Sequence, residues 1–272
     1  MRSADRSARG DMLAGMATFD DRPATADDLL PLALTSYGHF TTLRIEADGR
    51  VRGLSLHLER LVRDARTLFG TAVDTGRVRK LIRAATAGRD LPCTVRVTHY
   101  DPALNLTRPA EATGPRFLVT VRPAGELSSP PLAVMSVVYE RDLPLVKHCG
   151  LVGALHARRT AQLAGFEDAL LIGRDGLVSE GVTWNVGFVD ADGRIVRPEG
   201  PALPGVTEAL LPGGASEPVP LERTKGMRTA FATNAAIGVR ALSSVDGTPL
   251  DTAHPVLDEL REAYLAVPGE EL

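Results

Sequence analysis

Four Asp-Gly pairs constrain the fold of this chain more than any other sequence feature: Asp48-Gly49, Asp175-Gly176, Asp192-Gly193 and Asp246-Gly247. Because Asp and Gly both adopt positive φ readily, such a pair between alternating apolar residues predicts the turn of a β-hairpin. Three hairpins are predicted from the flanking segments: residues 41–45 with 50–54, residues 169–172 with 177–180, and residues 184–189 with 194–197. We therefore expect much of the chain to form β-sheet.

Helical segments and one linker complete the expected organisation. Apolar residues recur at helical spacing in four segments: residues 56–69, 78–87, 151–164 (ended by Gly165) and 255–265. The segment of residues 123–131 is rich in Pro, Ser and Gly and is the best linker candidate. We expect an α+β protein with a disordered extension over residues 1–15, a small N-terminal domain over 16–122, a linker over 123–131 and a larger, strand-rich domain over 132–272. Met16 is an alternative start of the chain.

Composition and motifs exclude several classes of protein. A net charge of −3 gives no overall attraction to nucleic acid or to anionic membranes, and no apolar run reaches the ~20 residues that span a bilayer. Cys93 and Cys149 do not form a disulfide framework, so we expect a cytoplasmic protein. His148 and His156 lack the spacing of zinc motifs, and no metal site is predicted. A glycine-rich dinucleotide fingerprint, a Walker-type loop and a Gly-x-Ser-x-Gly elbow are also missing.

Lys147 is the main candidate for covalent chemistry, because lysine is rare in this chain. Only three of the 31 basic residues are lysine, namely Lys80, Lys147 and Lys225. A lysine amine can be neutralised by its surroundings and can form a Schiff base with a carbonyl, whereas a guanidinium cannot. Lys147 also lies between an apolar run, residues 132–138, and an amphipathic stretch, residues 151–164. This strand-to-helix junction indicates chemistry on a carbonyl, although position alone would also suit an ordinary surface lysine.

Three further segments offer groups that pyridoxal phosphate (PLP) requires. A carboxylate such as Glu180 beside the pyridine nitrogen would keep that nitrogen protonated, although a hairpin glutamate can simply be solvated. Arg60 could hold a phosphate through two hydrogen bonds, although an arginine on a helix face is usually a solvated charge. The Pro-Gly turn of residues 203–208 offers N–H groups and the Thr207 hydroxyl to a phosphate, although a simple capping turn uses the same residues. Each signal is weak alone, and their order along the chain indicates a PLP enzyme.

The ordered motifs resemble the class IV, fold-type IV family of PLP enzymes over about residues 37–247. The resemblance is carried by these segments: residues 40–44 (FTTLR), 57–61 (HLERL), Lys147 with 161–171, 176–181 (GLVSEG) with Asn185, 203–207 (LPGVT) and 231–247. The family includes branched-chain and D-amino-acid aminotransferases, (R)-selective amine transaminases and 4-amino-4-deoxychorismate lyases. Together these motifs are highly specific for the family.

The resemblance implies a two-domain enzyme with a small N-terminal α/β domain, a larger strand-rich pseudobarrel domain, PLP at the domain interface and a homodimeric assembly. It implies that Lys147 forms the Schiff base and moves a proton, and that Glu180 contacts the pyridine nitrogen. The residues implied to hold the phosphate are Arg60, Val206, Thr207, Asn234 and Ala235. Arg96 stands where the family often carries a substrate-binding arginine, and Arg44 is a second candidate of this kind.

Departures from the family pattern leave the reaction open. Many members have a tyrosine four or five residues after the lysine, where this chain has Leu151 and Val152. Many aminotransferases have a threonine where this chain has Ala235. We expect a transaminase that moves an amino group between an amine or amino acid and a keto acid. The alternatives are a 4-amino-4-deoxychorismate lyase, suggested by the Asn234-Ala235 pair, and a non-catalytic binding protein of the same fold.

Overall fold

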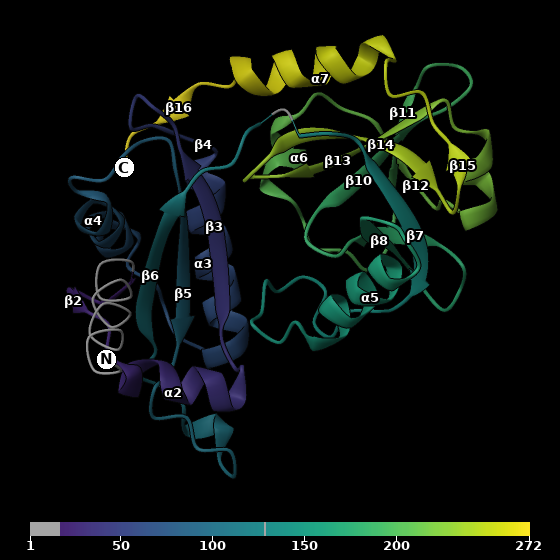
Figure 1. Ribbon diagram of the computed structural model, residues 1–272. Helices are drawn as coiled ribbons and strands as arrows, with labels where there is room; N and C mark the ends of the chain where they lie inside the picture. The colour runs from purple at the N-terminus through teal and green to yellow at the C-terminus, as the bar shows by residue number, and fades with distance from the viewer. Residues whose placement is uncertain (1–16, 128) are drawn as a thin grey trace, which may run out of the picture. The chain divides into compact units, whose positions relative to one another are not determined.

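The computed structural model describes residues 17–127 and 129–272, so the extension predicted for residues 1–15 lies outside the described part of the chain. The described residues form two compact units (Figure 1). Unit 1 contains the chain up to Ala124 together with Val146–Gly150 and Gly269–Leu272. Unit 2 contains Gly125–Leu145 and Leu151–Pro268. The domain limits expected from the sequence remain predictions.

Unit 1 is built on a five-stranded antiparallel sheet with the order β2-β1-β6-β5-β3. Its elements are β1 (Ala17–Phe19), β2 (Arg22–Pro23), α2 (Ala26–Thr35), β3 (His39–Ile45), β4 (Val51–Arg52), α3 (Leu54–Phe69), α4 (Thr75–Thr86), β5 (Cys93–Tyr100), the 3-10 turn η1 (Pro109–Glu111), β6 (Arg116–Pro123) and β16 (Gly269–Glu270). Strand β4 pairs with β16 in a separate two-stranded sheet. Strand β3 therefore lies at an edge of the larger sheet.

The core of unit 1 lies between this sheet and the helices α3 and α4. Alternate residues of a strand face opposite sides of a sheet, and Leu43 and Ile45 of β3 face the helices. Leu58 and Leu61 of α3 belong to the same buried cluster, as does Ile82 of α4. Burial of each such side chain contributes roughly 1.5–3 kcal/mol. The two helices predicted over residues 56–69 and 78–87 are thus confirmed.

The first hairpin prediction is wrong in its pairing. Asp48-Gly49 does form a turn, in which Gly49 has a φ of 79°. Strand β3, however, pairs along its whole length with β5. The chain after the turn forms β4, which pairs with β16, and α3 already begins at Leu54. An Asp-Gly pair specifies that the chain reverses, whereas the partner of each strand depends on segments that are distant in sequence.

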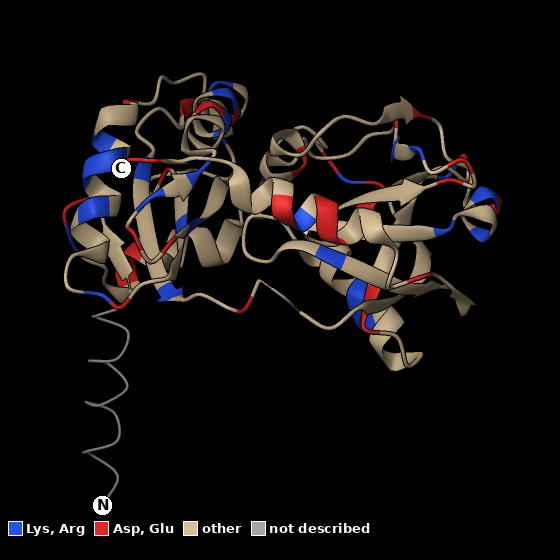
Figure 2. Ribbon diagram, turned by 90° about the horizontal axis from the view of Figure 1, so that it is seen from above, with Lys and Arg blue, Asp and Glu red and all other residues tan. Residues whose placement is uncertain are grey.

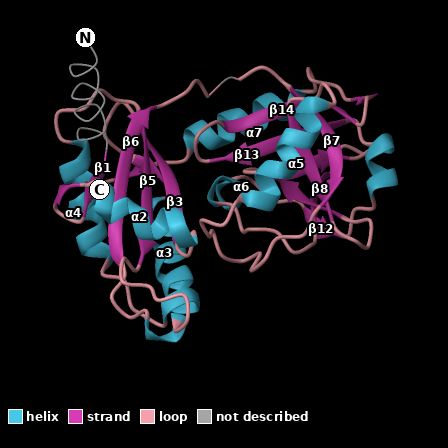
Figure 3. Cartoon of the chain, turned by 60° about the horizontal axis from the view of Figure 1, so that its bottom comes forward, coloured by secondary structure: helices cyan, strands magenta, loops and turns pink. Residues whose placement is uncertain are grey.

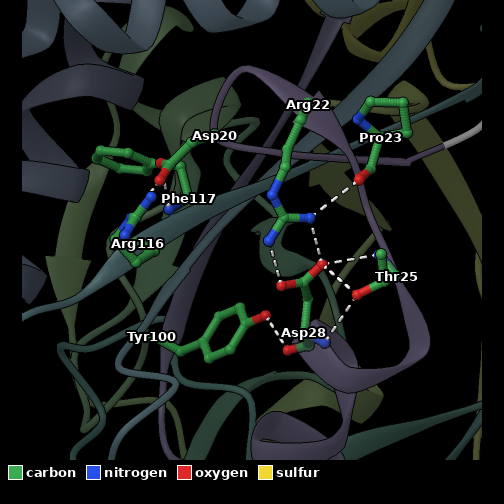
Figure 4. A network of polar contacts seen from close by, with 8 residues as sticks. All are labelled: Asp20, Arg22, Pro23, Thr25, Asp28, Tyr100, Arg116 and Phe117. Atoms are coloured by element: carbon green, nitrogen blue, oxygen red, sulfur yellow. Dashed lines mark hydrogen bonds and ion pairs between the residues drawn. The ribbon is translucent and has the colours of Figure 1, made fainter.

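The start of α2 is held by a network of polar side chains (Figure 4). Asp28 accepts a hydrogen bond from the Thr25 N–H at 2.7 Å, and the Thr25 hydroxyl accepts one from the Asp28 N–H at 3.4 Å. This reciprocal pair is a capping box. Arg22 donates two hydrogen bonds to the Asp28 carboxylate, at 2.7 and 2.6 Å, and holds the pKa of that carboxyl well below its usual range. The phenol of Tyr100 donates to the Asp28 carbonyl oxygen at 2.5 Å, which ties α2 to β5.

Unit 2 contains a nine-stranded sheet with the order β12-β11-β10-β13-β14-β7-β8-β9, in which β15 pairs with β14. Its elements are β7 (Leu132–Val138), α5 (Val152–Leu163), β8 (Asp168–Ile172), β9 (Val178–Gly181), β10 (Asn185–Val189), β11 (Ile195–Pro198), α6 (Val206–Leu210), β12 (Ala215–Glu217), the 3-10 helix η2 (Leu221–Gly226), β13 (Thr229–Asn234), β14 (Gly238–Val245), β15 (Thr248–Pro249) and α7 (Pro255–Ala266). Strand β7 runs parallel to both β8 and β14. The hairpins predicted around Asp175-Gly176 and Asp192-Gly193 are confirmed as β8–β9 and β10–β11. Strands β7, β8 and β14 of this sheet are labelled in Figure 3.

The curled sheet of unit 2 has a different cluster on each face. Leu170 of β8 packs in a central cluster with Trp184 and Phe188. The next residue, Leu171, points to the opposite face and packs against the alanines of α5. In the same way Phe231 of β13 packs against α7, away from the central cluster. The helices predicted over residues 151–164 and 255–265 are therefore confirmed as α5 and α7, each covering an outer face.

Acidic and basic residues are interspersed along the ribbons of both units (Figure 2). This mixing agrees with the small net charge of −3. Within residues 17–127 and 129–272, no helix combines the length and the apolar character that crossing a membrane requires.

Candidate active site

Lys147 lies in a short segment that unit 1 holds by its main chain. The segment Val146–Gly150 belongs to unit 1, although the chain on either side of it belongs to unit 2. It runs along the edge of β3, where Phe40 donates its N–H to the Lys147 carbonyl oxygen at 2.9 Å. Cys149 donates its N–H to the Gly38 carbonyl oxygen at 2.8 Å. The segment thus covers part of an edge that would otherwise leave polar groups of the strand unpaired.

Helix α3 holds the Lys147 peptide from another direction. The N–H of Lys147 donates to Oδ2 of Asp64 at 2.9 Å, although 83 residues separate the two in sequence. Asp64 is fully buried, and its Oδ1 pairs with the Arg63 guanidinium at 2.9 Å. Both main-chain polar groups of Lys147 are therefore engaged, one by β3 and the other by α3.

The amine of Lys147 lies beside the ring of Phe40. Its Nζ is 5.1 Å from the ring centroid, and the guanidinium carbon of Arg96 is 3.5 Å from the same centroid. Arg96 also donates to the Thr98 hydroxyl at 3.1 Å and lies 3.6 Å from the Cys149 sulfur. Burial raises the pKa of the Cys149 thiol, and Arg96 acts in the opposite direction. The structure thus brings Lys147 and Arg96, two residues predicted from the sequence, to one aromatic ring.

Three buried polar side chains follow one stripe of α3: His57, Arg60 and Asp64. Their spacing of three and four residues places them on the same face of the helix. Nδ1 of His57 lies 2.7 Å from the Thr41 hydroxyl, and its buried Nε2 has no hydrogen-bond partner among the described residues. Burial lowers the pKa of His57 to about 3, with smaller contributions from the charges of Arg60 and Lys147. This buried stripe of α3 thus carries one guanidinium and one carboxylate, and the charges of Arg60 and Lys147 both act on His57.

In unit 2, Glu180 on β9 is buried rather than solvated, with 3% of its surface exposed. Its Oε2 accepts the N–H of Leu203 at 3.3 Å. Its Oε1 lies 3.4 Å from Nε of Arg141, whose side chain is 6% exposed. Arg141 also lines a cavity of about 430 Å³, together with Tyr139 and Arg174. A carboxylate and a guanidinium at this distance in a buried setting stabilise each other's charge.

The Pro204-Gly205 turn is tied to the strand that follows Glu180. Asn185 of β10 donates from Nδ2 to the Leu203 carbonyl oxygen at 2.7 Å. A Cβ atom at Gly205 would lie 2.1 Å from Oδ1 of Asn185, so a larger residue cannot occupy the turn without a shift. Helix α6 begins after it, and Thr207 in its first turn is buried. The Thr207 hydroxyl has no hydrogen-bond partner among the described residues.

Asn234 and Ala235 lie where β13 ends. Oδ1 of Asn234 accepts the N–H groups of Ala236 and Ile237 at 2.9 and 3.1 Å. Its Nδ2 donates to the Thr183 carbonyl oxygen at 3.4 Å. Because the Asn234 side chain shapes this turn and Ala235 has no polar side chain, contact of the pair with a phosphate would use main-chain N–H groups.

Comparison with known proteins identifies the family. The family profile described as Amino-transferase class IV matches residues 38–245, which include every candidate residue named above. The chain belongs to the class IV aminotransferase family. This confirms the resemblance inferred from the motifs, and it favours transamination over both the lyase and the binding-protein alternative. No curated protein sequence matches the chain.

Solved structures share the fold of this class IV aminotransferase. The branched-chain aminotransferase of Escherichia coli has a TM-score of 0.81 at 17% identity, covering 93% of each chain. The branched-chain aminotransferase of the thermophilic archaeon Thermoproteus uzoniensis, solved with norvaline, has a TM-score of 0.77 at 20% identity, covering 92% of this chain and 93% of that one. A hypothetical aminotransferase from Mycobacterium tuberculosis in a PLP-bound form has a TM-score of 0.77 at 19% identity, covering 92% of this chain and 99% of that one. The predicted fold-type IV architecture is therefore confirmed.

Arg44 of this class IV aminotransferase lies apart from Lys147. Arg44 is four residues from Phe40 along β3, a separation of about 13 Å. Its Nε pairs with Glu46 at 3.1 Å, and Glu46 also pairs with Arg52. The structure therefore brings Arg96, but not Arg44, close to the ring beside the lysine.

Two residues at this site were not predicted from the sequence. Asp64 could have been found, because it follows Arg60 by four residues and places a charge on a stripe of α3 that otherwise packs inward. Arg141 carried no such signal, because it lies in an irregular segment between β7 and α5. Its proximity to Glu180 depends on a contact between segments 39 residues apart, and no local pattern encodes it.

Proposed function

We propose that this class IV aminotransferase uses PLP bound at Lys147 to transfer an amino group between an amine or amino acid and a keto acid. The observation that carries the proposal lies at the turn of residues 203–207 in unit 2. One side of this turn donates a main-chain N–H to the buried Glu180 carboxylate, and the other side presents the buried hydroxyl of Thr207, which has no partner within residues 17–127 and 129–272. A carboxylate for the ring nitrogen and a donor for the phosphate are the groups PLP requires.

The residues present fit this cofactor. Buried polar groups in native proteins almost always have a partner, and a phosphate oxygen would satisfy the Thr207 hydroxyl. In unit 1 the charges of Arg60 and Lys147 both act on the buried His57, and Arg60 is the side chain that we assign to the phosphate. The main-chain N–H groups at Val206 and at the Asn234-Ala235 turn would complete the phosphate contacts.

Each residue has a separate role in the proposed reaction. PLP, when bound, supplies an electron sink that makes a proton on the substrate carbon removable. Nζ of Lys147 would attach the cofactor, and in its free form it would accept the proton from the substrate carbon and deliver it to the cofactor carbon. Glu180 holds a proton at the ring nitrogen, and Arg141 beside it keeps that carboxylate in place. Arg60 and Thr207 orient the phosphate.

Substrate recognition and assembly are part of the proposal. The guanidinium of Arg96 lies next to the ring that contacts Lys147, and we assign it to the carboxylate of an amino-acid or keto-acid substrate. Arg44 is a second and less favoured candidate, because Glu46 already neutralises it. A homodimer is supported by the resemblance to the family, and the cytoplasm by the cysteine content.

Two measurements test the proposal. The purified protein should show the visible absorbance of bound PLP, and borohydride should fix one cofactor on the peptide that contains Lys147, as judged by mass spectrometry. The Lys147→Ala variant should show neither signal. With an amine donor, product beyond one equivalent per enzyme should form only when a keto acid is present, because the cofactor itself can take up one amino group and then needs an acceptor. Multiple turnovers without an acceptor, as a lyase would give, would contradict the proposed reaction.

A further inference from the structure

We propose that Asp64 is a positioning residue that fixes the main chain of Lys147 to helix α3 and thereby sets the place of its amine relative to Arg60. This inference rests on the proposed roles of Lys147 and Arg60 as cofactor ligands. Asp64 acts through the peptide of the lysine rather than on the reacting atoms. Its effect on the reaction is therefore indirect.

The bond between Asp64 and Lys147 is strong for its type. A carboxylate that accepts a main-chain N–H forms a charge-assisted hydrogen bond, which is roughly twice as strong as a neutral one. The N···O distance is 2.9 Å, and Asp64 is 0% exposed, so water does not compete for the carboxylate. Arg63 compensates the buried charge through Nε and a terminal nitrogen, at 3.0 and 2.9 Å from Oδ1. A buried carboxylate serves packing poorly, so its presence indicates a specific task.

That task is to restrict rotation of the segment Val146–Gly150 about the edge of β3. The two hydrogen bonds to Phe40 and Gly38 both lie along one strand edge. Two hydrogen bonds along one line do little to oppose rotation about that line. The bond from Lys147 to Asp64 comes from a different element and opposes this rotation. These three hydrogen bonds together attach the segment to two elements of unit 1.

Helix α3 then relates the lysine to the proposed phosphate ligand. Arg60 and Asp64 are one turn apart on the same face, which is about 6 Å along the helix axis. The buried contacts of Leu58 and Leu61 hold α3 against the sheet that contains β3. The spacing between the Arg60 guanidinium and the Lys147 peptide is thus set within one packed element of unit 1. A misplacement of about 1 Å at a reacting group can lower a rate on the order of 100-fold.

Hydrogen exchange at single amides of the full-length protein tests the tether without any catalytic readout. In the wild type, the Lys147 amide should be protected. In Asp64→Ala its exchange should speed up by at least about 10-fold, while the Cys149 amide, which is bonded to Gly38, should change much less. Asp64→Asn keeps an acceptor oxygen and should retain most of the protection. Leu58→Ala is the matched control in the same helix, and it should speed up exchange across α3 and β3 without singling out Lys147.

The rate of PLP capture at Lys147, measured by borohydride trapping, tests the functional half. We expect Asp64→Ala to slow capture on the order of 10-fold to 100-fold, with rescue in Asp64→Asn and little change in Leu58→Ala. Equal exchange of the Lys147 amide in wild type and Asp64→Ala would overturn the tether. Faster exchange with an unchanged capture rate would overturn the positioning role. If the wild type captures no PLP, the proposed function is wrong, and the exchange data still decide whether Asp64 holds the lysine peptide.

Discussion

Nε2 of His39 lies 3.0 Å from Nδ1 of His99 across the β3–β5 pair, so one imidazole donates a hydrogen bond to the other. Only a pair with at least one neutral ring can form such a bond. Both side chains are buried, and burial lowers the pKa of His39 to about 3 and that of His99 to about 4. The pair therefore stays neutral in the folded protein at any ordinary pH.

These histidines should make the protein less stable as the pH falls from 7 to 5. In the unfolded chain the pKa of histidine is about 6.5, so between that value and the lowered folded values the unfolded chain binds more protons. The contribution is fully present above about pH 6.5, and below it decreases by at most about 1.4 kcal/mol per pH unit per histidine. Urea unfolding at pH 8, 6.5 and 5 measures this slope. A His39→Gln/His99→Gln variant should have a shallower slope, and an identical slope would contradict the explanation.

The capping box of α2 should contribute measurably to the stability of unit 1. Replacing the Thr25 hydroxyl in Thr25→Ala should lower the free energy of unfolding by about 1 kcal/mol. Because the folded pKa of Asp28 is lowered, its contribution is fully present above the unfolded value of about 3.9 and decreases progressively as the pH falls from there toward the lower folded pKa. Asp28→Asn should therefore be less stable than the wild type at pH 7, and the difference should become smaller as the pH falls below about 3.9. Asp27→Asn, in the same first turn but outside the box, is the control and should change little.

Gly205 should be required for cofactor affinity rather than for folding alone. In Gly205→Ala the new Cβ would meet Oδ1 of Asn185 at 2.1 Å, so either the Asn185 amide that bonds to Leu203 or the turn before Thr207 must shift. We expect PLP binding, followed by the fluorescence of Trp184, to weaken by at least about 10-fold, which corresponds to ~1.4 kcal/mol. A Cβ at Gly213 meets no atom within 4 Å, so Gly213→Ala is the matched control. Equal PLP affinity in the two variants would show that the turn does not hold the cofactor.

The Thr207 hydroxyl should affect binding of PLP much more than stability. Thr207→Val keeps the shape of the side chain and removes a hydroxyl that lacks a partner among the described residues. Removing such a group should leave the melting temperature unchanged or slightly higher, and PLP binding should weaken by about 1–3 kcal/mol. Thr229, at the opposite end of β13 from Asn234, is also buried, and its hydroxyl likewise has no partner in the part of the chain that the structure describes. Thr229→Val should leave PLP affinity unchanged, and an equal loss in both variants would argue against a phosphate contact at Thr207.

The roles of Arg96 and Arg44 can be distinguished by comparing KM for substrates that carry a carboxylate with KM for neutral amines. Removing a charge-assisted hydrogen bond to a substrate carboxylate loses about 1.5–3 kcal/mol, so Arg96→Ala should raise KM for amino acids by roughly 10-fold to 100-fold. The same variant should leave KM for a neutral amine nearly unchanged. Arg44→Ala should alter stability through Glu46 and leave both KM values close to those of the wild type. A larger KM effect from Arg44→Ala would reverse the assignment.

Much of the local structure and several candidate residues could be predicted because their signals are local. Asp175-Gly176 and Asp192-Gly193 encode reversals of the chain over a few residues, and α3 follows from apolar spacing within one segment. Lys147 stood out because lysine is rare, and Glu180 because of the motif around it. The proposed roles of these residues remain to be tested by the experiments above.

Only the tertiary structure decided which segments meet. Asp48-Gly49 specified a turn, yet β3 pairs with β5, and Leu43 and Ile45 pack in one buried cluster with Val95 and Val97 of that strand. The sequence marked Lys147 as a nucleophile, but not that β3 and Asp64 hold its peptide within unit 1. Periodicity and turn chemistry act over a few residues, whereas a hydrogen bond across 83 residues forms only after the intervening chain has packed. The residue types therefore determine which chemistry the candidate residues can perform, and the packing of the folded chain determines where those residues lie.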